Sequence, residues 1–229
     1  MLDSLPQELM EQLETKISFT IPIFGGIPVP ESAVVTWLIM AVVVLGAVLL
    51  TRNLKVKPAG RAQIFCEMVV GGINNFIKSI LGDKWRAFAP YLGTIAIYLA
   101  FANLIGLVGL KPPTKDLNVT AALAVMSIVV ILGAGIRYRG VGGWLKSYAE
   151  PMPILLPINV LEIFIRPLSL CMRLFGNVLG AFVVMELIKT VAPVIVPLPF
   201  SMYFDVFDGL IQTMVFVFLT TLFIKEAVE

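Results

Sequence analysis

Long apolar runs without charged residues are the first pattern along the chain. Three segments have this character: Ser32–Thr51, Ala87–Leu110 and Leu117–Ile136. A helix needs about 20 apolar residues to cross the hydrocarbon core of a bilayer, and each run has at least that length. We therefore predict three transmembrane helices, at about 32–51, 87–110 and 117–136, that stand upright in the membrane.

A fourth segment, Arg61–Leu81, is apolar on one side only. Its other side carries Glu67, Asn74, Asn75 and Lys78. This two-sided pattern predicts an amphipathic helix at about 61–81 that lies on the membrane surface. A polar membrane-spanning helix is the alternative interpretation.

The last third of the chain mixes apolar runs with charges and prolines. The mostly apolar segment Ile154–Met185 would measure about 48 Å as a helix, whereas the hydrocarbon core is about 30 Å thick. Such a helix must tilt or bend. Three prolines then interrupt 192–200, and a further apolar helix follows. We predict a tilted helical hairpin at about 154–190 and 201–225.

The composition supports a membrane protein and disfavours other classes. Apolar residues make up 59% of the 229 residues and charged residues 14%, whereas soluble domains have about 45–50% and about 25%. A globule of this size cannot hide such an excess from water, so a soluble domain, a disordered chain and a nucleic-acid-binding protein are disfavoured. The chain has no histidine and only two widely separated cysteines, which excludes His-ligated metal sites and leaves no zinc or redox spacing. We predict an all-α integral membrane protein without a cofactor or a metal.

The distribution of basic residues predicts the orientation. The connection 52–86 holds seven Lys or Arg residues and the connection 137–153 holds three, so both are expected in the cytoplasm. Alternation then places the N-terminus outside and the C-terminus in the cytoplasm. We expect an extracytoplasmic N-terminal segment at 1–31, with a short helix at Gln7–Lys16 and an extended connection at Thr20–Pro30, and a single membrane domain at 32–229.

Charged residues inside the membrane segments concentrate in the final hairpin. These residues are Glu162, Arg166, Arg173, Glu186, Lys189, Asp205 and Asp208. Charges at this depth are costly, and they usually face protein or water along an ion or substrate path. The cluster therefore marks the hairpin as the candidate site.

The spacing of these residues predicts two polar stripes. One helix carries Glu162, Arg166, Ser169, Arg173, Asn177 and Gly180, separated by 4, 3, 4, 4 and 3 residues. At 3.6 residues per turn they share one face, while Glu186 and Lys189 fall on the opposite face. Asp205, Asp208 and Gln212 share a face of the last helix.

Simpler interpretations stay open for several of these residues. Glu162 and Arg166 are spaced to neutralise each other, and Asp205 and Asp208 fit the outer membrane interface. Arg173 has no acid within one helical turn. Because a guanidinium stays protonated in a protein, Arg173 needs an acid from another chain or one of the aspartates across the hairpin.

At this point the sequence resembles a known family. Arg173-Leu174-Phe175-Gly176-Asn177, preceded by Arg166-Pro167-Leu168-Ser169-Leu170, resembles the signature of subunit a of the rotary F-type ATP synthase of the bacterial type. Gln212 followed by an aromatic-rich helix resembles the last helix of that family. Asp116-Leu117-Asn118-Val119-Thr120 resembles the start of its fourth helix. The resemblance covers about residues 30–225.

The resemblance implies a stator subunit that is not itself catalytic. Its partners would be the c-subunit ring, the b-subunit peripheral stalk and the rest of the ATP synthase, in the inner (plasma) membrane of the cell. It would form two ion half-channels for H⁺ or Na⁺. Arg173 would face the c-ring carboxylates between the channels, and so couple ion flow to ring rotation and ATP synthesis.

The resemblance also implies roles for other residues. Those expected on the ion path or facing the ring are Asn177, Gln212, Glu162, Arg166, Ser169, Asp205 and Asp208, followed by Glu186, Asn118 and Asp116. Relatives often carry a carboxylate or histidine nine residues after the arginine, where this chain has Phe182. Asp205, Asp208 or Glu186 would then serve the outer channel.

Two other functions compete with this interpretation. A stand-alone ion-coupled secondary transporter often has internal repeats and broken helices, but this chain shows no repeat and its charges lie in one hairpin. A membrane enzyme needs a nucleophile–base or metal constellation, which the sequence does not offer.

Overall fold

The computed structural model describes residues 17–21, 27–52, 60–147, 156–191 and 197–229. Within these residues, five helices are long and apolar enough to cross a membrane. They confirm the class of an all-α integral membrane protein. The short helix predicted at Gln7–Lys16 lies outside the described residues.

Before the first long helix, the chain forms a small antiparallel ladder. Strand β1 (Ile17–Ile21) pairs with strand β2 (Ile27–Pro30), with Phe19 opposite Val29. The extended connection predicted here therefore includes a two-stranded hairpin, which leads directly into α2.

The helices follow the predicted segments closely. Their bounds are α2 (Glu31–Thr51), α3 (Arg61–Leu81), α4 (Trp85–Leu104), α5 (Leu117–Ser147), α6 (Leu156–Val191), α7 (Pro197–Ser201) and α8 (Gly209–Val228). Short 3₁₀ turns occupy Gly82–Lys84, Ile105–Val108 and Pro113–Lys115, and a π-helix occupies Met202–Asp208.

One predicted boundary is wrong. The structure continues α5 to Ser147, whereas the sequence predicted a connection from residue 137 onward. A break at Gly140, where φ is +70°, divides the helix. Glycine adopts this left-handed conformation without the steric cost that a side chain would bring, so the chain bends and then resumes a helix through Trp144.

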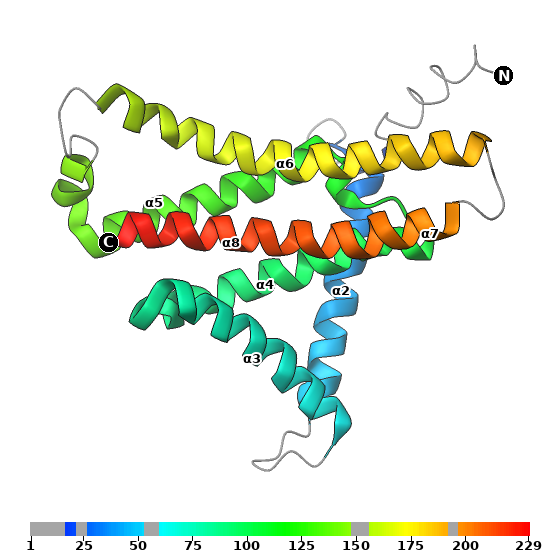
Figure 1. Cartoon of the computed structure of the whole chain (residues 1–229), viewed down its shortest axis with the longest axis horizontal. Coiled ribbons are helices and arrows are strands. Elements are labelled where there is room, and N and C mark those ends of the chain that lie inside the picture. The colour runs from blue at the N-terminus through cyan, green and yellow to red at the C-terminus, as the bar shows by residue number, and fades with distance from the viewer. Residues whose placement is uncertain (1–16, 22–26, 53–59, 148–155, 192–196) are drawn as a thin grey trace.

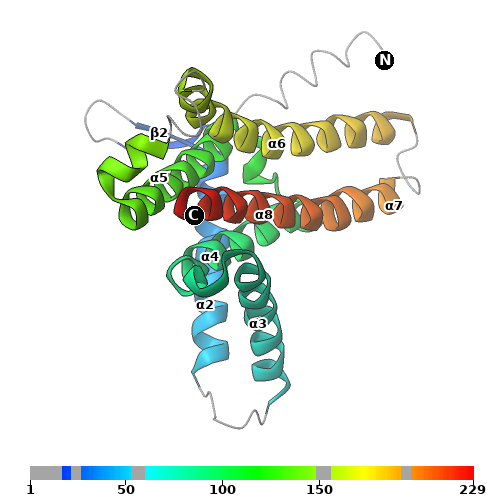
Figure 2. The same ribbon diagram turned by 60° about the vertical axis from the view of Figure 1, so that its left-hand side comes forward.

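Figure 1 shows that α4, α5, α6 and α8 run alongside one another, while α2 crosses their direction. The sequence grouped α4 and α5 with α2 as upright spans, and the structure groups them with the C-terminal hairpin. The charge-free runs determine length and apolarity, but packing against neighbours sets the tilt of a membrane helix. Figure 2 shows the same layer from the side, with α2 and α3 extending away from it.

The core lies around α8, which packs between α4 and α5 and also contacts α3 and α6. Phe216 and Ile224 of α8 are almost fully buried, as are Leu92 of α4 and Leu174 of α6. By contrast, α6 buries one narrow side and leaves Phe164, Leu168 and Met172 exposed. The fold thus holds α6 and α8 side by side and leaves the outward face of α6 open.

Candidate functional site

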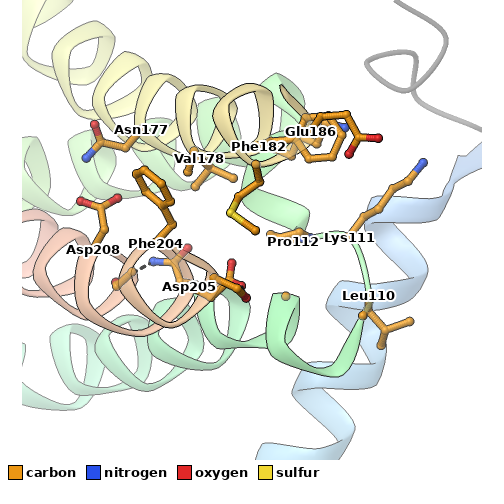
Figure 3. A pocket seen from close by; sticks show the side chains of 18 of the residues that line it. Leu110, Lys111, Pro112, Asn177, Val178, Phe182, Glu186, Phe204, Asp205 and Asp208 are labelled. Carbon is orange, nitrogen blue, oxygen red and sulfur yellow. Dashed lines mark hydrogen bonds between the residues drawn. The ribbon is translucent and has the colours of Figure 1, made fainter. Parts of the chain in front are cut away.

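A polar cavity of about 610 Å³ lies between the C-terminal half of α6, the π-helix and the turns that follow α4. We call it the Asp205 cavity (Figure 3). Its polar and charged lining residues are Asn103, Lys111, Lys115, Asn177, Glu186, Lys189, Ser201, Asp205, Asp208 and Gln212. The cavity therefore brings together residues that are far apart in the chain, from Asn103 to Gln212.

Two aspartates reach this cavity from the π-helix. The Ser201 hydroxyl donates a 2.6 Å hydrogen bond to Asp205 Oδ2. The other oxygen, Oδ1, lies 2.8 Å from the place that a Cβ on Gly106 would occupy, so only glycine leaves room for it. The wide turn of a π-helix is a frequent feature of functional sites, and here it presents Asp205 and Asp208 to one cavity.

Asn177 and Gln212 join α6 to α8 at the inner end of this cavity. Asn177 Nδ2 donates a 2.7 Å hydrogen bond to Gln212 Oε1. Gln212 is only 3% exposed, and its Nε2 has no hydrogen-bond partner among the described residues. Since buried donors normally have a partner, this N–H is suited to water or to a passing polar group. Figure 3 shows Asp208 near Asn177, on the facing helix.

A buried asparagine braces the cavity from behind. Asn103 of α4 donates to the Gly209 carbonyl at 2.9 Å and to Thr213 Oγ1 at 3.3 Å. It also accepts a hydrogen bond of 3.1 Å from the Thr114 hydroxyl. These contacts tie α4 and the turn before α5 to the first turn of α8.

The mouth of the Asp205 cavity is rich in lysine. Lys111 pairs with Glu31 at 3.9 Å, and Lys189 pairs with Glu186 at 3.6 Å. The ammonium of Lys115 lies 3.3 Å from the centroid of the Phe182 ring. Burial, followed by the charge of Lys111, lowers the pKa of Lys115 to about 8, although Glu186 and Glu31 raise it.

A second cavity, of about 440 Å³, lies at the other end of the α6–α8 pair. We call it the Glu226 cavity. Arg166 Nη2 donates 2.6 Å hydrogen bonds to both Glu162 and Glu226. Arg139 of α5 donates to the backbone oxygen of Glu226 at 2.9 Å. The pairing of Arg166 with Glu162 that the sequence allowed is present, and Glu226 is an additional partner.

Arg173 lies on α6 between the two cavities and lines neither. Its side chain is exposed, and within the described part of the chain it makes no hydrogen bond or ion pair, so neither Asp205 nor Asp208 neutralises it. Leu170 and Leu174 are buried on the adjoining side of the same helix. The guanidinium of Arg173 is therefore exposed beside the buried side of α6.

Open space surrounds the glycines that follow Arg173. A Cβ built on Gly176 or Gly180 would meet no atom within 4 Å. Small residues often mark a close contact between membrane helices, but no described helix lies against these two glycines. The face of α6 around Arg173 and these glycines is thus uncovered.

The structure brings most of the predicted site residues into the two cavities. Asn177, Gln212, Asp205, Asp208 and Glu186 line the first, and Glu162 and Arg166 line the second. Glu186 and Lys189, predicted on the face opposite Arg173, occupy the side of α6 that faces the Asp205 cavity.

Besides Arg173, three predicted residues lie outside both cavities: Ser169, Asp116 and Asn118. Ser169 is exposed on α6. Asp116 is buried at the start of α5, where it accepts hydrogen bonds from the Ser32 hydroxyl at 2.6 Å and from the Asn118 backbone at 2.9 Å. Asp116 and Asn118 thus stabilise a helix start and its attachment to α2.

Sequence reasoning missed Asn103, Lys115 and Glu226. Glu226 follows Gln212 by 14 residues, which is about four helical turns, so extending the polar stripe of the last helix would have found it. Lys115 and Asn103 carried no such signal, because a lysine in a short loop and an asparagine near a helix end are common.

Together the fold and site define a multi-pass α-helical membrane protein with two separate cavities along the α6–α8 pair. The comparisons with known proteins agree. A family model described as ATP synthase A chain matches residues 33–225. The chain belongs to this family, and therefore to the membrane sector of F-type ATP synthases.

Individual relatives extend over nearly the whole chain. ATP synthase subunit a of Moorella thermoacetica is 37% identical over 206 residues, which cover 90% of this chain and 94% of that protein. ATP synthase subunit a 1 of Hahella chejuensis is also 37% identical over 206 residues, covering 90% and 87%. The sodium-ion-specific ATP synthase subunit a of Propionigenium modestum is 31% identical over 219 residues, covering 89% and 75%.

Proposed function

We propose that this chain is the stator that couples transmembrane ion flow to rotation of a c-subunit ring, with Arg173 facing the ring carboxylates. The observation that carries the proposal is the exposed guanidinium of Arg173, which has no partner among the described residues and lies on an uncovered helix face. A cation in a membrane protein needs an anionic partner, so the acid comes from another chain.

The two cavities serve as ion half-channels in this proposal. No residue lines both of them. Arg166 and Asn177, which bound the gap on α6, are 11 positions apart, or about 16 Å along the helix. An ion that enters one cavity therefore cannot pass straight into the other, and a ring site must carry it past Arg173.

Electrostatics explain how Arg173 separates the channels. A carboxylate that faces lipid must be neutral, because a bare charge in hydrocarbon is prohibitively costly. Opposite a fixed cation it ionises and releases its ion. Arginine suits this position because its guanidinium keeps its charge. The same charge repels H⁺ or Na⁺ that would leak directly between the cavities.

The proposal includes an orientation and partners. The Asp205 cavity opens at the turns after α4, which the positive-inside rule places outside the cell, and the Glu226 cavity opens toward the cytoplasm. The subunit sits in the inner membrane beside the c-ring and the b-subunit stalk. It carries the ion path, and other subunits perform the chemistry on ATP.

Replacing Arg173 tests the coupling role. Arg173→Ala in the assembled synthase should reduce ATP-driven ion pumping to background, while the subunit remains inserted and assembled. Arg137→Ala is the matched control, because Arg137 is also exposed but lines neither cavity. Normal coupled pumping by Arg173→Ala would refute the proposal, and ion flux through the chain without a ring would favour a stand-alone transporter.

Cross-linking tests which face meets the ring. A cysteine at Gly180, on the uncovered face of α6, should form a disulfide with an engineered cysteine on the c subunit. Val129 on α5 is 61% exposed but lies on another helix, so Val129→Cys should not. Cross-linking of Val129→Cys in place of Gly180→Cys would show that the ring lies elsewhere.

A further inference from the structure

We propose that Lys115 is a proton relay at the mouth of the Asp205 cavity. The inference rests on the proposed function, since it requires this cavity to be an ion path. In the inward direction the Lys115 ammonium gives a proton to a cavity water: one N–H bond breaks, its electron pair stays on nitrogen, and a hydronium ion forms. The neutral amine then takes a proton from the water outside, which regenerates the ammonium and leaves no net change in the lysine.

The geometry holds this amine at the cavity. Thr114, on one side of Lys115, is fully buried and bonded to Asn103, and Asp116, on the other side, is 5% exposed and bonded to Ser32. The backbone N–H of Lys115 also donates to the Pro112 carbonyl at 3.1 Å. Because both neighbours are anchored, the lysine projects from a fixed turn.

Phe182 places the amine at the rim of the cavity. The Lys115 ammonium lies 3.3 Å from the centroid of its ring, and both residues line the Asp205 cavity. The face of an aromatic ring attracts a cation without accepting its proton. Phe182 thus orients the amine while leaving proton transfer to water.

Charged groups on each neighbouring element determine how easily the Lys115 amine gains or loses its proton. Lys115 is surrounded by Lys111 on its own turn, Glu31 at the start of α2, Glu186 and Lys189 on α6, and Asp205 and Asp208 across the cavity. Burial and Lys111 lower the pKa of Lys115 to about 8, against the opposite effect of Glu186 and Glu31. Lys115 is mostly protonated below that pH and mostly neutral above it. Near pH 7 about one amine in ten is neutral, so both states of the relay are populated.

The same arrangement favours H⁺ over Na⁺ as the ion that enters here. A sodium ion in this cavity would meet the ammonium groups of Lys111, Lys115 and Lys189, which line it together with Asp205 and Asp208. Like charges repel more strongly in a partly desolvated cavity than in water. A proton handed on by an amine meets no such barrier, because the amine itself carries it.

The experiment uses the intact synthase in sealed vesicles and measures ATP synthesis at a fixed membrane potential. The pH is varied only in the compartment that faces Lys115. In the unmodified protein the rate should fall as this pH rises through about 8, where the ammonium becomes neutral. Lys115→Gln should lower the rate about tenfold or more. It should also remove the fall in rate at alkaline pH, which we call the alkaline limb. Lys115→Arg should be equally slow, because arginine keeps the charge but does not release its proton.

Two further variants move the alkaline limb in opposite directions. Lys115→His keeps a titratable group of lower intrinsic pKa, about 6.5, so the limb should shift down by more than one pH unit. Lys111→Gln removes the like charge that lowers the Lys115 pKa, so the limb should shift upward. A simple loss of positive charge at the mouth would affect both lysines alike.

The outcomes separate this inference from the function on which it rests. The relay is overturned if Lys115→Gln or Lys115→Arg keeps the unmodified rate and limb, if Lys111→Gln shifts the limb downward, or if added Na⁺ stimulates the rate. Measured alongside, Arg173→Ala should abolish coupling at every pH. If it does so while the Lys115 variants behave normally, only the relay falls; if Arg173→Ala stays coupled, the proposed function falls.

Discussion

The buried contact between Asn103 and Thr114 offers a quantitative test of how the cavity is held together. We consider Asn103→Leu, which keeps the branched shape of the side chain but removes all three hydrogen bonds. The two acceptors on α8 keep a partner, because Thr213 Oγ1 still donates to the Gly209 carbonyl at 2.9 Å. The Thr114 hydroxyl does not, since its acceptor is Asn103 Oδ1 and it is fully buried.

The magnitude follows from this asymmetry. A stranded buried hydroxyl costs about 1–3 kcal/mol, and each lost bond whose acceptor keeps another partner costs about 0.5 kcal/mol. Asn103→Leu should therefore lower the free energy of unfolding by about 2–4 kcal/mol. Adding Thr114→Val removes the stranded hydroxyl, so the double variant should recover about 1–2 kcal/mol relative to the sum of the single changes.

The assay is a denaturant titration of the purified chain in detergent, followed by the fluorescence of its three tryptophans. Asn75→Leu is the control, because Asn75 is exposed on α3 and makes no hydrogen bond among the described residues. It should change stability by less than about 0.5 kcal/mol. The reasoning is refuted if Asn103→Leu changes the free energy of unfolding by less than about 0.5 kcal/mol. It is also refuted if the effects of Asn103→Leu and Thr114→Val on that free energy are additive.

Two further predictions concern the cavities. Gly106→Ala should displace the Asp205 carboxylate, which lies 2.8 Å from the new Cβ, and reduce ATP-driven pumping several-fold. Gly133→Ala is the control, because a Cβ at Gly133 would meet nothing within 4 Å, and this variant should pump normally. Equal pumping rates for the two variants would disprove the close contact between Gly106 and Asp205. Glu226→Gln should cost less than about 1 kcal/mol of stability, because Glu226 is 59% exposed. Arg166→Gln should cost more, since it leaves two carboxylates without their shared cation; an equal loss in the two unfolding titrations would contradict the 2.6 Å bonds.

The positions of the helices could be predicted because each depends on local pattern. The amphipathic stretch Arg61–Leu81 is α3 with the same bounds, and the long segment predicted at 154–190 is α6 at Leu156–Val191. Apolar run length and the 3.6-residue period determine these elements without reference to the rest of the chain. The end of α5 was missed, because the charge-free run stops at Ile136 and the basic residues after it were assigned to a connection.

The candidate site could be predicted on each helix separately but not between helices. Periodicity placed Arg173 and Asn177 on one stripe, and Asp205, Asp208 and Gln212 on another. It could not show that Asn177 binds Gln212 or that Arg166 binds Glu226, since those partners are 35 and 60 positions away. The role of Arg173 toward a ring stays a prediction.

The sequence by itself determined the membrane class, the helical segments, the family and the absence of an acid within one helical turn of Arg173. These follow from apolar excess, period and motif, which are properties of neighbouring residues. Only the tertiary structure decided that two separate cavities flank Arg173, that Lys115 lies on Phe182, and that Asn103 joins α4 to α8. Such contacts depend on how the helices cross and pack, and tilt and rotation are set by neighbouring helices. No local pattern specifies them.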